Sequence, residues 1–339
     1  MEFLGLGPAV LVLFVSFGFM VGVFFGFFGM GGAFLVTPTL LILGYPAPVA
    51  VGSSMAFVFG TAVIATMKHH DVGQVGYKLG ALMFAGIALG IEVGKRVVFF
   101  FDTLGRAEVV VGSLYILLLA GVGLLFVRSA LERGETDSDE SSDDDVPEIA
   151  KRIKSYHVPP MVTLADGTKA SLWTISGVGA GVGIVSGVLG VGGGFIRMPA
   201  IYYLIGVPLA VAVGTSLFGA LMSGAVGAFS YGLMGAIDVG VVTALLVGSA
   251  LGARIGSAAT VYVDEDDVTI YFGLMLLLAS LAVAFGELAT WLDVPIFRRV
   301  SFVLLVGSAV FVTLVIFYFS VRAIRNDPTV SAATPDHGD

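Results

Sequence analysis

The chain has 339 residues, of which 57% are hydrophobic and only 12% charged, with four histidines, no cysteine and a formal net charge of −8. An ordinary soluble domain is about 25% charged, so this composition excludes a soluble globular protein and indicates an integral membrane protein. The lack of cysteine excludes disulfides, thiolate metal sites and cysteine nucleophiles.

Apolar segments of about 20 residues, long enough to cross a bilayer, recur along the whole chain. They are expected to be helices, because lipid cannot satisfy the open edges of strands. The first lacks a basic leader and continues into a motif that recurs in mid-chain, so we expect a mature helix rather than a signal peptide. The sequence thus predicts an all-α integral membrane protein that crosses the cell (plasma) membrane many times. In chain order the segments are 3–28, 47–67, 76–98, 105–128, 172–190, 208–230, 237–260, 268–290 and 300–322, with shorter ones at 33–44 and 194–206.

An internal repeat organises the chain. Residues 26–38 (GFFGMGGAFLVTP) return as residues 187–199 (GVLGVGGGFIRMP), and residues 45–54 match residues 207–216 after one inserted residue. Each half therefore consists of a long helix, a glycine break, a short helix and three further spans. The expected parts are a first repeat at 1–128, an acidic, disordered cytoplasmic linker at 129–170, a second repeat at 171–290, an additional C-terminal helix at 291–325 and a polar tail at 326–339.

Two topologies are open, and they depend on the short helices. If these span the membrane, each half has five crossings and the halves are inverted; if they are re-entrant, each half has four and the halves are parallel. Both arrangements leave 10 loop and tail Lys and Arg inside against 5 outside, so charge does not decide between them. We favour inverted repeats, because repeats with broken helices commonly take that form.

The glycine breaks are candidate binding sites. A break in mid-membrane exposes backbone N–H and C=O groups, and the short helix that follows directs its positive amino end toward the break, which suits an anion. The alternative is tight packing of crossed helices without a ligand. A nucleotide loop is excluded because no strand precedes the glycines and no lysine follows them. The expected substrate-binding glycines are Gly29, Gly31, Gly32, Gly190, Gly192, Gly193 and Gly194.

Arg197 is the only charged residue in either short segment and stands where the first copy has Val36. An intramembrane arginine costs at least about 2.5 kcal/mol to insert and normally faces a cavity or a partner. Its planar guanidinium suits an oxyanion. The alternatives are that Arg197 extends to the membrane surface or pairs with Glu92. Glu92 itself either meets its repeat equivalent Arg254 or pairs locally with Lys95 and Arg96.

Hydroxyl residues are further candidates for substrate binding, and two prolines and two glycine series are expected to have structural roles. Ser53, Ser54, Thr215 and Ser216 follow glycine in equivalent positions, and they either donate to an oxyanion or bond their own backbone. Pro38 and Pro199 lie about a turn inside the short helices, where proline frees backbone groups. Two glycine series at four-residue spacing are expected to pack helices closely: Gly86, Gly90 and Gly94, and Gly248, Gly252 and Gly256.

No catalytic set is present, so we expect neither an enzyme nor a cofactor. The histidines of KHHDVG (68–73) are adjacent, which indicates a solvated loop and no metal site. Few acidic residues near the membrane core are available to bind a coupling proton or sodium ion: Glu92, Asp238 and Glu287.

The two glycine motifs, each followed by VAVGSS or VAVGTS and a glycine-stepped helix, resemble the sulfite exporter TauE/SafE family of membrane permeases. The resemblance covers residues 3 to about 322 apart from the acidic linker. It implies transport of sulfite, sulfonates or related sulfur oxyanions. The expected function is secondary transport of a small anion, with export favoured, and the expected partners are that anion and the lipid bilayer, without nucleic acid. The alternative is a non-transporting subunit or scaffold whose glycines only pack helices.

Overall fold

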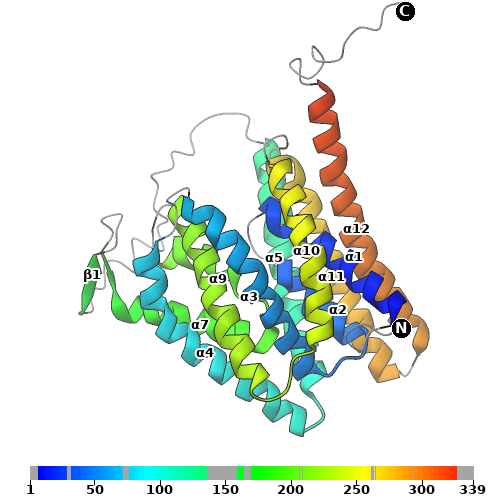
Figure 1. Cartoon of the computed structure of the whole chain (residues 1–339), viewed down its shortest axis with the longest axis horizontal. Coiled ribbons are helices and arrows are strands. Elements are labelled where there is room, and N and C mark those ends of the chain that lie inside the picture. The colour runs from blue at the N-terminus through cyan, green and yellow to red at the C-terminus, as the bar shows by residue number, and fades with distance from the viewer. Residues whose placement is uncertain are drawn as a thin grey trace, which may run out of the picture.

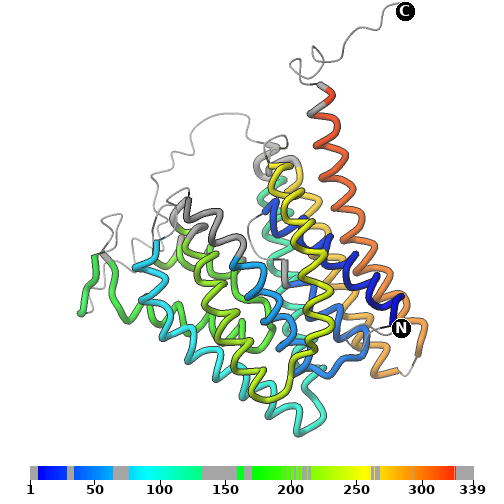
Figure 2. Tube along the Cα trace, in the orientation of Figure 1, coloured from blue at the N-terminus to red at the C-terminus, as the bar shows by residue number. Residues whose placement is uncertain are grey.

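The structure is a computed structural model that describes residues 7–28, 32–71, 76–135, 159–163, 169–205, 207, 209–260, 263, 265–292 and 294–326. Long helices form a bundle in which segments from the two ends of the chain lie side by side (Figures 1 and 2). The expected segments appear as helices within a few residues. The long ones are α1 (Pro8–Phe28), α3 (Ala47–Asp71), α4 (Tyr77–Thr103), α5 (Ala107–Glu135), α7 (Leu172–Leu189), α9 (Leu209–Gly232), α10 (Val239–Ala259), α11 (Glu265–Leu292) and α12 (Pro295–Asn326).

Short helical pieces follow α1 and α7. A 3₁₀-helix, η1 (Gly32–Leu35), leads into α2 (Val36–Ile42), and α8 (Gly194–Ala200) leads into a π-helix, η2 (Ile201–Ile205). Each of α2 and α8 has only seven residues.

Six of the described helices are long and apolar enough to cross a membrane: α1, α5, α7, α10, α11 and α12. Helices α3, α4 and α9 are of similar length, at 24 to 27 residues. These three contact one another in the bundle, where protein rather than lipid surrounds much of their surface. The molecule is an all-α integral membrane protein.

The structure differs from the expected boundaries in several places. Helix α3 continues through Asp71, so the first part of KHHDVG is helical rather than a loop. Helix α5 continues to Glu135, because the residues after 128 are mostly good helix formers. Two short antiparallel strands, β1 (Met161–Thr163) and β2 (Lys169–Ser171), precede α7. The rest of the acidic linker and the tail after 326 lie outside the described residues.

Helix α1 packs against α10 through glycine. A Cβ placed on Gly22 would lie 2.4 Å from the carbonyl oxygen of Ser249, and one on Gly252 would lie 2.0 Å from that of Phe19. The two backbones touch, which only glycine permits at these positions. Helices α4 and α7 make the equivalent contact, since a Cβ on Gly90 would lie 2.3 Å from the carbonyl oxygen of Ala180.

The glycine contacts also give the helix directions. Gly18 of α1 faces Leu245 and Gly26 faces Ala253, so α1 and α10 run parallel. In the same way, Gly86 faces Ser176 and Gly94 faces Ile184, so α4 and α7 run parallel.

Helices α3 and α9 run antiparallel, because Gly52 faces Tyr231 whereas Phe59 faces Gly224. Helices α5 and α11 are antiparallel as well, with Gly112 against Glu287 and Gly123 against Gly273. In both pairs, helices matched by the sequence repeat run in opposite directions.

Helix α3 is parallel to α10 and therefore to α1, because Gly52 faces Ala236 and Gly60 faces Leu246. The end of α1, at Gly26, lies beside Ala253. The start of α3 therefore lies at the level of Ala236 and the end of α1 at the level of Ala253. These two levels are about 25 Å apart along α10 at the helical rise of 1.5 Å per residue. The segment containing η1 and α2 therefore carries the chain back across most of the bundle.

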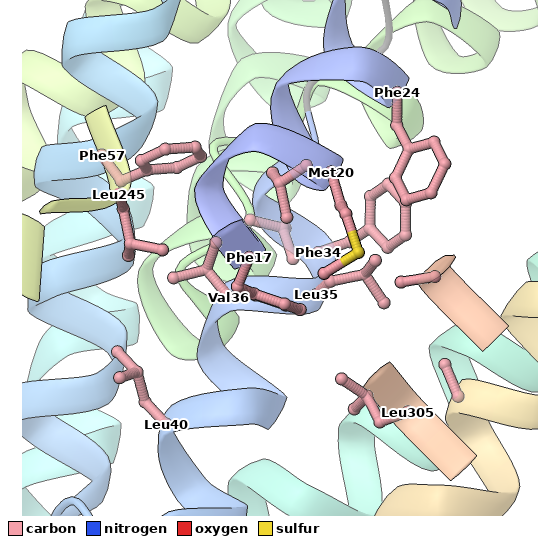
Figure 3. Close-up of a cluster of buried hydrophobic side chains, with 14 of the residues drawn as sticks. Phe17, Met20, Phe24, Phe34, Leu35, Val36, Leu40, Phe57, Leu245 and Leu305 are labelled. Atoms are coloured by element: carbon pink, nitrogen blue, oxygen red, sulfur yellow. The ribbon is translucent and has the colours of Figure 1, made fainter. Parts of the chain in front are cut away.

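The main core cluster gathers side chains from both halves. Phe17, Phe24, Phe34, Leu245 and Leu305 come together from α1, η1, α10 and α12 (Figure 3). Helix η1, which follows the first glycine break, is thus embedded in aromatic and aliphatic side chains.

Candidate functional site

The second glycine break has a left-handed backbone at three residues. Helix α7 ends at Leu189, and Gly190, Gly192 and Gly193 have φ values of 75°, 65° and 72°, which side-chain-bearing residues rarely adopt. Gly194 then begins α8. The break packs closely against helix α3 of the first half. Cβ atoms on Gly190 and Gly192 would lie 2.9 Å from Val51 O and 2.4 Å from a Val58 methyl group.

At the first break, Gly29 and Gly31 lie outside the described residues, and Gly32 begins η1. Pro38 is the third residue of α2. Pro199 is the sixth residue of α8, and the π-helix η2 begins two residues later. Because proline has no N–H for the α-helical bond, it suits this change of helix type.

Carbonyl groups at the end of α7 receive hydroxyl donors from three other helices. The Tyr231 hydroxyl donates to Gly187 O at 2.6 Å, and the Tyr115 hydroxyl donates to Leu189 O at 2.5 Å. The Thr37 hydroxyl lies 2.8 Å from the same Leu189 oxygen. Sequence reasoning missed these residues, because nothing in the spacing of Thr37, Tyr115 and Tyr231 connects them to the break.

Arg197 is completely buried, with 0% of its surface exposed. Its Nη1 donates to Ser216 O at 3.0 Å, and its Nη2 donates to Gly192 O at 3.1 Å and to Ser223 Oγ. Ser216 and Ser223 lie on the middle turns of α9. The guanidinium therefore lies at mid-depth in the bundle, between α9 and the break.

No carboxylate of the described residues pairs with Arg197. The ion pairs in that part of the chain join Glu92 to Lys95 at 2.7 Å and to Arg96 at 3.1 Å, which is the local arrangement considered above. Arg254, the repeat equivalent of Glu92, is exposed. The alternatives in which Arg197 pairs with Glu92 or reaches the membrane surface, and in which Glu92 meets Arg254, are therefore wrong.

Glycine surrounds the arginine. A Cβ on Gly219 would lie 2.7 Å from Arg197 Cδ, and one on Gly193 would lie 3.1 Å from Nη2. Arg197 Nε has no hydrogen-bond partner among the described residues, and neither has the buried hydroxyl of Ser186 beside Gly193. The site thus holds a fixed positive charge whose hydrogen-bonding capacity is only partly used by protein.

Each of the four expected hydroxyls bonds a group outside its own helix. Ser53 Oγ accepts from the backbone N–H of Asp238 at 2.9 Å, and Thr215 Oγ1 accepts from that of Gly76 at 3.1 Å. Asp238 and Gly76 are themselves equivalent in the repeat and precede α10 and α4. Each of these hydroxyls therefore ties its own half to the other.

The second hydroxyl of each motif bonds the short helix of its own half. Ser216 Oγ donates to Gly194 O at 2.8 Å, and Ser54 Oγ lies 2.7 Å from Thr37 Oγ1. The four residues thus hold the helices around the breaks in place.

The acids near the membrane core are largely engaged elsewhere. Glu92 is held by Lys95 and Arg96, and the Asp238 carboxylate caps α10 by accepting from the N–H of Val241 at 3.0 Å. Glu287 packs against Gly112 of α5. Within the described residues, no three histidine or acidic side chains cluster as metal ligands would; the side chains of His69 and His70 lie outside that description.

The sequence of this chain is similar to those of a family of membrane proteins. The family model for sulfite exporter TauE/SafE matches residues 14–283. The probable membrane transporter protein YunE of Bacillus subtilis is 25% identical over 215 residues, which cover 61% of this chain and 72% of that protein. A probable membrane transporter protein of Xylella fastidiosa (strain 9a5c) is 29% identical over 210 residues, covering 61% and 68%.

Sulfite exporter TauE/SafE family protein 6 of Arabidopsis thaliana is 26% identical over 121 residues, covering 34% of this chain and 28% of that protein. No solved structure matches the chain. The family match spans both glycine breaks and, in whole or in part, the helices from α1 to α11. The chain is therefore a multi-pass membrane transporter that belongs to the sulfite exporter TauE/SafE family.

Proposed function

We propose that this transporter carries a small oxyanion, of the class of sulfite and sulfonates, out of the cell, and that Arg197 is its principal binding residue. One observation carries the proposal: Arg197 is fully buried at mid-depth and has no carboxylate partner among the described residues. A charge in such a place is expensive to bury and normally marks a substrate pathway. The neighbouring oxygens are neutral, so the net positive charge remains to attract an anion.

The guanidinium of Arg197, rather than a helix terminus, supplies the positive charge of this site. Helix α8 has only seven residues, about two turns, and the side chain of Arg197 adds a full charge beside its first residues. The planar guanidinium can hold two oxygens of an oxyanion at once. Sulfite and sulfonates offer such oxygens, and membership in a permease family favours transport over a scaffold role.

The membrane potential supports outward movement. One charge moved through 100 mV changes free energy by about 2.3 kcal/mol, so a dianion leaving a negative-inside cell gains about 4.6 kcal/mol. Two of the three acids considered for coupling are already engaged in an ion-pair cluster and a helix cap. We propose export that requires no coupling ion.

Counterflow of labelled sulfite in proteoliposomes tests the proposal. The wild-type chain should exchange sulfite, and an inside-negative potential should accelerate efflux. Arg197→Ala should abolish exchange, whereas Arg254→Ala, which removes an exposed arginine, should retain it. Undiminished exchange by folded Arg197→Ala would refute the assigned site, and a silent wild-type chain would refute the substrate class.

A further inference from the structure

Three buried side-chain atoms in the described part of the chain have no hydrogen-bond partner: Ser186 Oγ, Arg197 Nε and Ser249 Oγ. Folded proteins pair nearly all such atoms, so each exception requires a physical reason. Two of the three lie at the second glycine break, and the third lies where α10 packs on α1. Their concentration at the break points to a ligand there.

Ser186 and Arg197 lie on either side of the same glycine. A Cβ on Gly193 would lie 2.5 Å from Ser186 Oγ and 3.1 Å from Arg197 Nη2. Ser186 is on the last turn of α7 and is 0% exposed. The left-handed conformation of Gly193, with φ of 72°, brings the hydroxyl and the guanidinium together.

The chemistry of the two groups selects an acceptor. A guanidinium only donates hydrogen bonds, whereas a serine hydroxyl can donate or accept. A ligand that serves both must present acceptor oxygens, as an oxyanion does. We propose that Ser186 is a second binding residue that donates its hydroxyl to the same oxyanion as Arg197, an inference that rests on the function proposed above.

The first half lacks both groups. The repeat places Phe25 at the position of Ser186 and Val36 at that of Arg197; both are buried, and Val36 belongs to the main core cluster. Two donors therefore meet at the second break and none at the corresponding positions of the first. The pair makes one anion site for each chain.

Removing a hydroxyl that has no protein partner should leave the fold intact, because no hydrogen bond within the protein is lost. Ser186→Ala should therefore melt at or above the wild-type temperature. Ser249→Ala is the matched control, since it removes the other unpartnered buried hydroxyl at a contact away from the break.

Sulfite counterflow, measured across a range of sulfite concentrations, distinguishes the variants. A hydrogen bond to a charged ligand is lost in Ser186→Ala, so its half-saturating sulfite concentration should rise roughly 10- to 100-fold while its maximal rate is kept. Ser249→Ala should match the wild type.

Two results would overturn the inference about Ser186 alone. The first is that the wild-type chain exchanges sulfite and Ser186→Ala has the same half-saturating sulfite concentration as the wild type. The second is that this concentration rises equally in Ser186→Ala and Ser249→Ala. A wild-type chain that exchanges no sulfur oxyanion would overturn this inference together with the proposed function.

Discussion

At the scale of single residues, the halves differ at a pair of matched positions. Arg197 and Gly219 are adjacent in the second half, where the missing side chain of Gly219 leaves room for the guanidinium. The repeat matches them with Val36 and Phe57, both about 1% exposed and part of the main core cluster (Figure 3). An arginine with glycine in one half corresponds to a valine with phenylalanine in the other.

Exchanging this pair separates stability from transport. The double variant Arg197→Val with Gly219→Phe should fold and melt near the wild-type temperature, because it reproduces an apolar pair that the first half already accommodates. It should exchange no sulfite, because the buried charge is gone. Thermal unfolding in detergent and counterflow in liposomes measure the two properties.

The single variant Gly219→Phe is the control for this double variant. Its Cβ would already lie 2.7 Å from Arg197 Cδ, and the ring needs still more room, so overpacking should destabilise the variant by about 1–3 kcal/mol or more. Sulfite exchange by the double variant would show that Arg197 only fills space.

At the scale of elements, glycine contacts determine which helices can approach. Gly86, Gly90 and Gly94 meet the backbone of α7, and Gly179, Gly183 and Gly187 of α7 meet that of α4 in return. The complementary series on α7 has the same four-residue spacing, so that spacing would have revealed it. The spacing does not reveal which two helices meet.

Gly90→Ala should lower stability by about 1–3 kcal/mol, because its methyl group would lie 2.3 Å from the carbonyl oxygen of Ala180 and force the backbones apart. Gly181→Ala, on the partner helix but with nothing within 4 Å of the added Cβ, is the matched control and should melt close to the wild type. Equal melting temperatures for the two variants would contradict this account of the α4–α7 contact.

At the scale of the whole molecule, helices matched by the repeat run in opposite directions, and α1 runs parallel to α3. We therefore propose inverted halves of five crossings each, followed by α12. The exposed Trp173 and Trp291 fit this arrangement, because they lie near the start of α7 and the end of α11, at opposite faces of the bundle in this topology. Tryptophan is enriched at both membrane interfaces.

Inverted halves predict that the linker and the C-terminus share the cytoplasmic side and that the N-terminus is external. Reporters of cytoplasmic location fused after Asp339 and inserted after residue 140 should both be active, and one fused before residue 1 should be silent. An external C-terminus would instead support four crossings in each half.

The sequence alone determined the membrane class, the extents of the spans and the positions of the two breaks. Hydrophobic length, glycine and proline act locally, so these features can be read without knowing what any helix contacts. The isolated charge of Arg197 is visible for the same reason. The local pairing of Glu92 with Lys95 and Arg96 also follows from helix spacing.

Only the tertiary structure decided what the breaks contact. The expectation that the hydroxyls of Ser53, Ser54, Thr215 and Ser216 would serve either an anion or their own backbone did not include bonds to other helices, because spacing along one helix does not reveal its neighbours. The equal charge counts left the two topologies open, whereas ordered contacts such as Gly18 with Leu245 fix helix direction. Burial and the missing carboxylate partner of Arg197 likewise depend on side chains from α7, α8 and α9, which meet only when the chain is folded.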